Sequence, residues 1–314
     1  MTPSGSPPRS RIHPLEDPLG TDGPFDAAHK APGMTVDPDA LVLPAFEDLA
    51  DLPGEATPWH NAYDLDRSAS IDGVPPPVRY GDRGVAVVPT GIGKTAAATT
   101  TAALCSSPRI DLDGALVLSV GAAGGPPALP IGSVVVADTI VDWDDKCRVD
   151  PDDEGSLALN PYTDEGAFEL DAGLLEEARA AADAVDLSEG PDRGTRSSDA
   201  APDPPTIAGG TNLCGDELWH GRELAAQAAW LVEANEAGPY RATEMEDAGT
   251  AAALERFGRL DRYLSVRGIS NHDRPPAGVP ARESLLDPGF EAGFGPAIEN
   301  AVRVARSVIE DLAA

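Results

Sequence analysis

Short, almost purely apolar runs bounded by turn residues are the feature that most restricts what this 314-residue chain can fold into. Runs of this kind are typical of β-strands that are covered on both faces of a sheet. They lie at Leu41–Leu43, Val85–Val88, Ala115–Leu118, Val134–Val136 and Tyr263–Val266. Apolar residues with helical spacing follow at Leu174–Val185, Leu224–Val232 and Ile298–Leu312. Strands that alternate with helices predict an α/β fold.

Two segments have a composition that does not suit this fold. Residues 1–38 are rich in proline, lack the apolar stretch of a secretory signal, and are predicted to be a disordered extension. Because Met34 comes just before the first strand-like run, we interpret residues 1–33 as the result of a start-site artefact. Residues 39–314 are predicted to form a single domain. Within it, residues 187–205 have loop composition and predict a flexible surface insertion.

The charge of the chain excludes one class of partner. The sequence has 53 acidic and 23 basic side chains, for a net charge of −30. A nucleic-acid-binding protein needs a basic surface, so nucleic acid is excluded as a partner. An acid-rich, lysine-poor composition is typical of proteins that work in concentrated salt, where repulsion among carboxylates is screened. We therefore expect a halophilic protein in a salt-rich cytosol.

Cysteine content and hydropathy restrict the setting further. The three cysteines, Cys105, Cys147 and Cys214, include no C-x-x-C pair, which argues against a disulfide framework and a cysteine zinc site. His220 and His272 are not joined by metal-ligand spacing either, so no metal and no cofactor is expected. No window approaches the roughly 18 to 20 apolar residues of a membrane helix. These features predict a cytoplasmic protein, soluble or peripheral, without a transmembrane segment.

A glycine-rich turn, Thr90–Thr95, follows the second strand-like run and leads into an Ala/Thr-rich helix. Backbone N–H groups at such a turn suit an anion or a closely approaching ligand. A P-loop would need a glycine where Val88 stands. A dinucleotide fingerprint is formally met by Gly91, Gly93 and Ala96, although it normally follows the first strand. A tight turn that allows close packing is the third alternative.

Several segments together carry a resemblance to a known family. In order and spacing, the nucleoside phosphorylase and nucleosidase superfamily is resembled by Thr90–Ala98, Ser119–Gly125, Glu244–Thr250 and Arg267–Asn271. Within it, the purine nucleoside permease family is resembled by Val141–Asp144, Gly215–Gly221, Met245–Asp247, Ser270–Pro276 and Pro296–Asn300. The resemblance covers roughly residues 40–313. It implies a three-layer phosphorylase/hydrolase-like fold with a mixed central sheet flanked by helices, and a homo-oligomer.

The resemblance implies a site for the sugar of a purine nucleoside. Members of the superfamily place a Met-Glu pair against the ribose, and here that pair is Met245 and Glu246. The carboxylate of Glu246 would accept hydrogen bonds from two vicinal hydroxyls, while Met245 would pack on the apolar face of the sugar. The glycines at positions 91, 93, 121 and 124 are expected near the substrate. An alternative is a capping box, with Thr243 as the N-cap and Glu246 three residues later.

The base would be held by residues that follow in the chain. Asn271 stands where many superfamily members have a catalytic aspartate and others an asparagine, which in related enzymes favours 6-oxopurines. Its amide can donate hydrogen bonds but cannot supply a proton as an acid does. Asp273 is the alternative acid, or else the exposed end of a loop. Trp219 is predicted either to stack on the purine or to anchor the core.

The place of the nucleophile departs from the pattern of the superfamily. The phosphate-binding turn has Ala122 instead of a serine, and Ser119 stands where an arginine would lie on the preceding strand. Each lost charge-assisted contact to a buried dianion costs on the order of 1.5 to 3 kcal/mol. The water-activating glutamate of the nucleosidases would fall at Leu49, with Glu47 and Asp48 beside it. Lys94 remains as one candidate cation, or as a solvated lysine at a helix end.

Two functions therefore remain open from the sequence. The first is a binding protein for neutral purine nucleosides in uptake or metabolism, in which the nucleophile site is lost. The second is an active nucleosidase or phosphorylase that cleaves the N-glycosidic bond, with Asp273 or Glu47 supplying the proton chemistry. A scaffold without a ligand is a third possibility. Whether the protein is an enzyme stays undecided at this point.

Overall fold

The computed structural model describes residues 35–48, 53–150, 156–163, 166–190, 204–287 and 292–313. The predicted extension lies outside the described residues up to residue 34, and the predicted insertion lies outside them at residues 191–203. Near the end of that extension, Val36 is buried and pairs with Ile110. At the start of the insertion, the backbone of Ser188 is bonded to the side-chain amide of Asn300.

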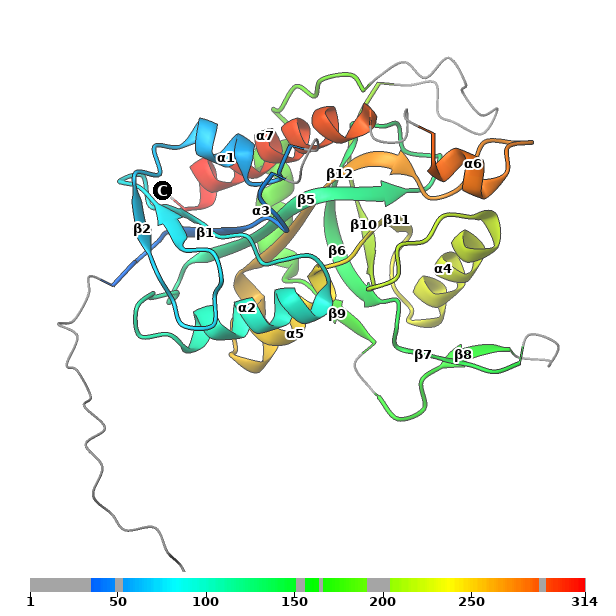
Figure 1. Cartoon of the computed structure of the whole chain (residues 1–314), viewed down its shortest axis with the longest axis horizontal. Coiled ribbons are helices and arrows are strands. Elements are labelled where there is room, and N and C mark those ends of the chain that lie inside the picture. The colour runs from blue at the N-terminus through cyan, green and yellow to red at the C-terminus, as the bar shows by residue number, and fades with distance from the viewer. Residues whose placement is uncertain are drawn as a thin grey trace, which may run out of the picture. The chain divides into compact units, whose positions relative to one another are not determined.

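Ten strands of the described residues form one sheet, and two more form a separate hairpin (Figure 1). The sheet contains β1 (Ala40–Leu43), β2 (Arg67–Ala69), β3 (Val78–Tyr80), β4 (Val85–Val87), β5 (Leu116–Gly125), β6 (Val134–Asp142), β9 (Ala167–Glu169), β10 (Ile207–Cys214), β11 (Tyr240–Glu244) and β12 (Tyr263–His272). The antiparallel hairpin contains β7 (Lys146–Arg148) and β8 (Leu157–Leu159). All five predicted apolar runs lie in the sheet or at the end of one of its strands.

The order of the main sheet is β11-β10-β6-β12-β5-β1-β4-β3-β2, with β9 beside β6. Parallel pairs such as β1–β5 and β12–β5 alternate with antiparallel pairs such as β12–β6, so the sheet is mixed. One end of β11 also pairs with β5, through Thr243 and Gly124. Strands β5, β11, β10, β6 and β12 therefore close into a ring, and the ends of β5, β11 and β12 meet.

Helices cover both faces of the sheet (Figure 1). They are α1 (Thr57–Ala62), α2 (Lys94–Ser106), α3 (Ala172–Ala182), α4 (Arg222–Ala234), α5 (Asp247–Arg256), α6 (Ala281–Leu285) and α7 (Phe294–Leu312). Helix α7 packs on β5 and β12 with α3 and α1 beside it, while α2 and α5 pack together on the opposite face. The predicted three-layer α/β fold with a mixed central sheet is confirmed.

The core explains why the strands can be almost purely apolar. Strands β1 and β4 are buried along their whole length, as expected in a sheet with helices on both faces. Helix α7 shows the opposite pattern, with a buried apolar stripe that includes Ile298, Val304 and Ile309 and a charged outer face. Strand β5 extends further than predicted, so Gly121–Gly124 lies inside a strand and not in a turn.

Close packing of β12 on α7 provides a test of this architecture. A Cβ added to Gly268 would collide with the backbone carbonyl of Ala297, which cannot move without shifting the helix. We expect Gly268→Ala to lower the free energy of unfolding by about 1 to 3 kcal/mol, the usual cost of overpacking. Chemical denaturation measures this. The control is Gly238→Ala, where the added atom meets only Thr211 at 4.0 Å; an equal loss there would contradict the packing argument.

Candidate functional site

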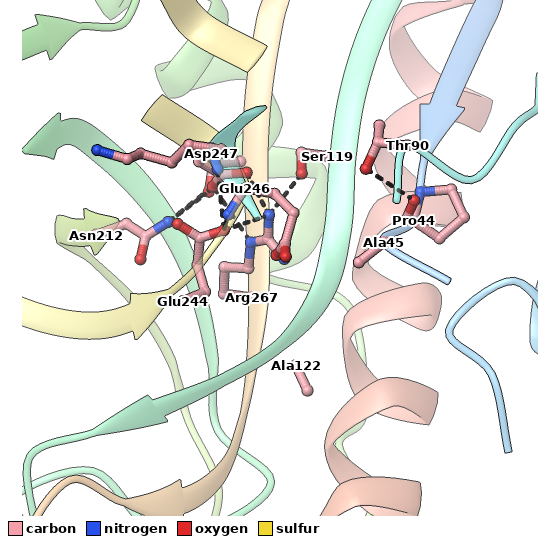
Figure 2. Close-up of polar contacts among 12 residues, drawn as sticks. Pro44, Ala45, Thr90, Ser119, Ala122, Asn212, Glu244, Glu246, Asp247 and Arg267 are labelled. Atoms are coloured by element: carbon pink, nitrogen blue, oxygen red, sulfur yellow. Dashed lines mark hydrogen bonds and ion pairs between the residues drawn. The ribbon is translucent and has the colours of Figure 1, made fainter. Parts of the chain in front are cut away.

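A buried arginine on β12 is the centre of the site. Arg267 is 1% exposed. It donates to the Ser119 hydroxyl at 2.6 Å on β5, and its Nη2 lies 2.9 Å from Glu244 Oε2 on β11. It also pairs through two nitrogens with Asp247 at the start of α5, and its Nη1 lies 3.8 Å from Glu246 Oε2 (Figure 2). Arg267 thereby joins β5, β11, β12 and α5.

Asp247 accepts more hydrogen bonds than any other carboxylate around Arg267. Besides Arg267, it accepts hydrogen bonds from Asn212 Nδ2 at 2.7 Å, from the Tyr263 hydroxyl at 3.0 Å and from the Ser265 hydroxyl. Burial acts to raise the pKa of Asp247, but the charge and the hydrogen bonds of Arg267 outweigh it and hold the pKa below its usual value. Asp247 is therefore an ionised partner of the arginine.

The side chain of Glu244, at the end of β11, binds the backbone at the start of α5. Its Oε2 accepts the backbone N–H groups of Glu246 at 2.8 Å and Asp247 at 3.0 Å. The capping box with Thr243 is wrong, because Thr243 lies in β11 and the helix begins only at Asp247. Burial, against the opposing charge of Arg267, raises the pKa of Glu244 to about 8. Glu244 therefore takes up a proton more readily than an exposed glutamate does.

Glu55 is a further buried carboxyl group and lies in the segment before α1. It accepts the backbone N–H of Ala45 at 2.7 Å and that of Ala122 at 2.8 Å. A Cβ added to Gly121 would lie 2.5 Å from Arg267 Nη1 and 2.6 Å from Glu55 Oε1, so the glycine gives both groups access to this end of β5. Burial raises the pKa of Glu55, although the charge of Arg267 opposes this.

Glu246 is held against the turn that opens α2. Its Oε1 accepts the backbone N–H of Gly93 at 3.0 Å, and its side chain is buried. Gly91 and Gly93 have φ angles of +88° and +94°, a region that other residues rarely adopt. The turn therefore serves close packing, and one of its N–H groups already serves a protein carboxylate. Burial raises the pKa of Glu246 to about 7, with the charge of Arg267 acting against it.

Lys94 forms ion pairs with two aspartates beside that turn. Its Nζ lies 2.6 Å from Asp142 and 2.7 Å from Asp144, and its backbone N–H donates to Asp216 at 2.7 Å. Burial acts to lower the pKa of Lys94, but its two aspartate partners raise it above the usual value. The interpretation of Lys94 as a solvated lysine is wrong, and its charge is already balanced by two carboxylates.

The predicted base and sugar contacts lie around the end of β5. Asn271 pairs with Gly124 across β12 and β5. A Cβ on Gly124 would lie 3.2 Å from Asn271 Nδ2 and 3.3 Å from Thr243 Cγ2, so the two strands approach closely there. The Asn271 side chain accepts the Ser270 hydroxyl at 2.8 Å and donates to the His272 carbonyl at 3.2 Å. Met245 is half-buried and follows β11 directly.

The structure gives Asp273 and Trp219 structural partners. Asp273 is 1% exposed and makes two hydrogen bonds with the Arg274 guanidinium, at 2.6 and 2.9 Å, so its interpretation as an exposed loop end is wrong. Trp219 is buried and stacks on Trp143 with ring centroids 5.6 Å apart. These contacts favour the core role of Trp219. Its stacking on a purine stays a prediction.

The remaining nucleophile candidates lie elsewhere. Glu47 is exposed and its Oε1 lies 3.4 Å from His60, while Asp48 is exposed and accepts hydrogen bonds from Thr57 and Gly54. Leu49 lies outside the described residues. Sequence reasoning missed four members of the cluster: Glu55, Glu244, Asp247 and Arg267. The signal for Arg267 was present, because a charged residue inside an otherwise apolar buried strand requires buried partners.

Two further expectations concern metals and membranes. Among the residues that the structure describes, no three His, Cys, Asp or Glu side chains are grouped so that they could hold a metal ion. Over the same part of the chain, no helix has the length and apolar character needed to cross a membrane.

Comparison with known proteins identifies the family and the fold. The family model described as purine nucleoside permease (NUP) matches residues 37–314. A purine nucleoside permease of Candida albicans is 26% identical, over 95% of this chain and 82% of its own length. The expected family is confirmed.

Solved structures support the fold alone, because their sequence identity is low. The 5'-methylthioadenosine/S-adenosylhomocysteine nucleosidase of Neisseria meningitidis superposes with a TM-score of 0.60 at 18% identity, over 88% of this chain and 99% of that one. The futalosine hydrolase of Helicobacter pylori gives 0.59 at 21% identity, over 86% and 97% of the two chains.

Removing the central guanidinium should destabilise the protein in a pH-dependent way. Breaking a buried ion pair by deleting one partner costs about 3 to 5 kcal/mol, so Arg267→Ala should lower the free energy of unfolding by that order. The loss should be larger at about pH 8 than at about pH 5. The pKa values of Glu244 and Glu246 are raised in the folded state, so these carboxyl groups bind protons as the pH falls and no longer repel one another when the arginine is absent. Denaturant titrations at both pH values measure the difference from the unaltered protein.

The control for this prediction is a surface ion pair. Arg67→Ala removes a pair with the exposed Asp82 and should cost less than about 1 kcal/mol. A loss at Arg267 as small as that at Arg67, or one independent of pH, would contradict the role of Arg267 as the shared countercharge.

Proposed function

This chain belongs to the purine nucleoside permease family, and from that premise we propose that it binds a neutral purine nucleoside where β5, β11 and β12 end. The observation that carries the proposal is the fixed position of Glu246. One of its oxygens accepts the Gly93 N–H, and the other faces Arg267 at 3.8 Å. A carboxyl group held in this way is preorganised before a ligand arrives, which reduces the cost of binding.

Recognition of the sugar would rest on Glu246 and Met245. Two vicinal hydroxyls of a ribose can both donate to one carboxylate, and hydrogen bonds to an ionised acceptor are about twice as strong as neutral ones. The half-buried thioether of Met245 can pack on the apolar face of the ring. This assignment agrees with the Met-Glu pair that the sequence shares with the superfamily.

Recognition of the base would rest on Asn271, in the half-buried end of β12 next to Gly124. A side-chain amide has one acceptor and two donor positions, which suits the edge of a purine. The missing side chain at Gly124 lets backbone and ligand approach closely at this point. We further propose that the protein forms a homo-oligomer, as the superfamily resemblance implies.

A phosphorylated ligand, and phosphorolysis, fit the site poorly. Ala122 offers no hydroxyl, Lys94 is paired with two aspartates, and Arg267 is already surrounded by carboxyl groups. An incoming dianion would add charge to a buried region that is already short of positive charge, which is unfavourable at low dielectric. These three observations support a neutral nucleoside.

Hydrolysis of the glycosidic bond is a second candidate function, favoured by Glu55. A buried carboxyl group with a raised pKa is suited to act as a general base. In that reaction a water molecule would give a proton to Glu55, the oxygen of the water would bond to the anomeric carbon, and the C–N bond would break. The departing base anion would take up one proton from solvent, and Glu55 would return its proton to solvent. Asn271 could stabilise the base only by hydrogen bonds.

Binding should depend on Glu246. We expect Glu246→Ala to weaken the affinity for inosine by tenfold or more, because a charge-assisted hydrogen bond contributes about 1.5 to 3 kcal/mol. Isothermal titration calorimetry with formycin B, whose C–C linkage cannot be hydrolysed, measures binding without turnover. Glu177→Gln is the matched control, since that carboxyl group is exposed on α3. Equal affinity in Glu246→Ala and the unaltered protein would refute the assignment.

Catalysis should depend on Glu55 if it occurs at all. Release of hypoxanthine from inosine is followed with and without phosphate. Hydrolysis requires release without phosphate, and we expect Glu55→Gln to abolish it while formycin B still binds, since general base catalysis contributes about 10²- to 10⁴-fold. Release only with phosphate would contradict the neutral-ligand argument. Binding without release would leave the binding function as the only one.

A further inference from the structure

The cluster around Arg267 has too few positive charges for its carboxyl groups. One buried guanidinium faces Glu55, Glu244, Glu246 and Asp247, and all four of these residues are buried as well. If every carboxyl group were ionised, three negative charges would be left without compensation. A buried, uncompensated charge is so costly that the group takes up a proton instead. The cluster must therefore hold protons at neutral pH.

Hydrogen bonding indicates which groups stay ionised. Asp247 accepts from two nitrogens of Arg267 and from Asn212, Tyr263 and Ser265. Such a set of donors favours the charged form. Glu55 accepts two backbone N–H groups, which act in the same direction although burial opposes them.

Glu244 and Glu246 each accept hydrogen bonds on one oxygen only, whereas Glu55 and Asp247 accept them on both. Glu244 Oε1 is buried and has no hydrogen-bond partner among the described residues, whereas its Oε2 accepts two backbone N–H groups and faces Arg267. Glu246 Oε1 accepts from Gly93, but its Oε2 lies 3.8 Å from Arg267 Nη1, beyond hydrogen-bond distance. The protons of the cluster therefore belong on Glu244 Oε1 and Glu246 Oε2.

We propose that the site is a proton-coupled binding site, in which a nucleoside displaces a proton from Oε2 of Glu246. The inference rests on the proposed binding function and deepens it. The O–H bond at Oε2 breaks, the proton passes to the solvent buffer, and a ribose hydroxyl donates to the carboxylate oxygen in its place. Glu244 keeps its proton and acts as a positioning residue, because its Oε2 fixes the backbone of Glu246.

The sign of the pH dependence follows from linkage. A ligand that prefers ionised Glu246 binds more tightly above the pKa of Glu246 in the free protein, which is about 7, and less tightly below it. Below that value the affinity should fall about tenfold for each pH unit, since one proton must leave for each ligand that binds. Above it, the affinity should level off.

The other groups around Glu246 do not reverse this sign. Burial is the main cause that raises the pKa of Glu246, and the negative charges of Glu55 and Asp247 act in the same direction. Glu244 keeps its proton and adds no charge. Arg267 stays charged, because its buried acidic partners raise its pKa despite desolvation. On the side of α2, the Lys94 ammonium is held by Asp142 and Asp144.

The test is calorimetric titration with formycin B in two buffers of different ionisation enthalpy. At about one pH unit below 7, the difference in heat should correspond to the release of nearly one proton per ligand. At about one unit above 7, the release should fall towards zero. Buffer-independent heat together with an affinity that does not change with pH would overturn the coupling and leave the binding function standing. Absence of binding would overturn both.

Two isosteric variants locate the proton. Glu246→Gln is always neutral, so its weakened binding should release no proton and should not change with pH. Glu244→Gln keeps an oxygen that can accept the N–H groups of Glu246 and Asp247, so proton release should persist. Release that persists in Glu246→Gln, or disappears in Glu244→Gln while binding remains, would overturn the assignment to Glu246. Glu177→Gln, at an exposed residue of α3, controls for the change of charge.

Discussion

The shared use of one guanidinium by several buried carboxyl groups is the interaction on which the site depends. Arg267 lies on β12, one of the strands of the ring, and its partners lie on β5, β11 and α5. An arginine can serve them together because its planar guanidinium has five donors in a fixed arrangement. The contacts that orient Glu246 are thus the same contacts that join three strands and a helix, so folding and preorganisation of the site cannot be separated.

The fold was predictable from the sequence because it depends on patterns that are local. Continuous apolar runs such as Leu41–Leu43 favour strands that are buried on both faces, and the helix at Phe294–Leu312 has a clear apolar stripe. The extent of β5 was not predictable in this way. Its glycines and alanines at Gly121–Gly124 have the composition of a turn, and only pairing with β12 and β11 makes them a strand.

The site was predictable only in the residues that belong to local motifs. Met245, Glu246 and Asn271 were proposed through such motifs, and their binding roles stay predictions. Glu55 is separated from Ala122 by 67 residues, and no pattern around it indicates that it accepts that N–H. Lys94 and Asp273 illustrate the opposite error, since each was considered as an available charge and each is paired in the folded chain. The partners of a charged residue depend on the tertiary fold.

The buried carboxyl groups around Arg267 differ from the other acidic residues of the chain in how their charge is screened. A net charge of −30 spread over the surface is screened by salt within about 10 Å at 0.1 M, so it has little effect on a buried group. The excess of carboxyl groups around Arg267 is shielded from solvent and is not screened in this way. In our proposal it is relieved by protons, which reside on the carboxyl groups that accept hydrogen bonds on one oxygen only. One of these is Glu246, the residue proposed to bind the sugar, so a neutral nucleoside would bind there with a change in the protonation of the cluster. The proposed selectivity against phosphate and the proposed coupling to protons therefore have the same physical cause, a shortage of buried positive charge.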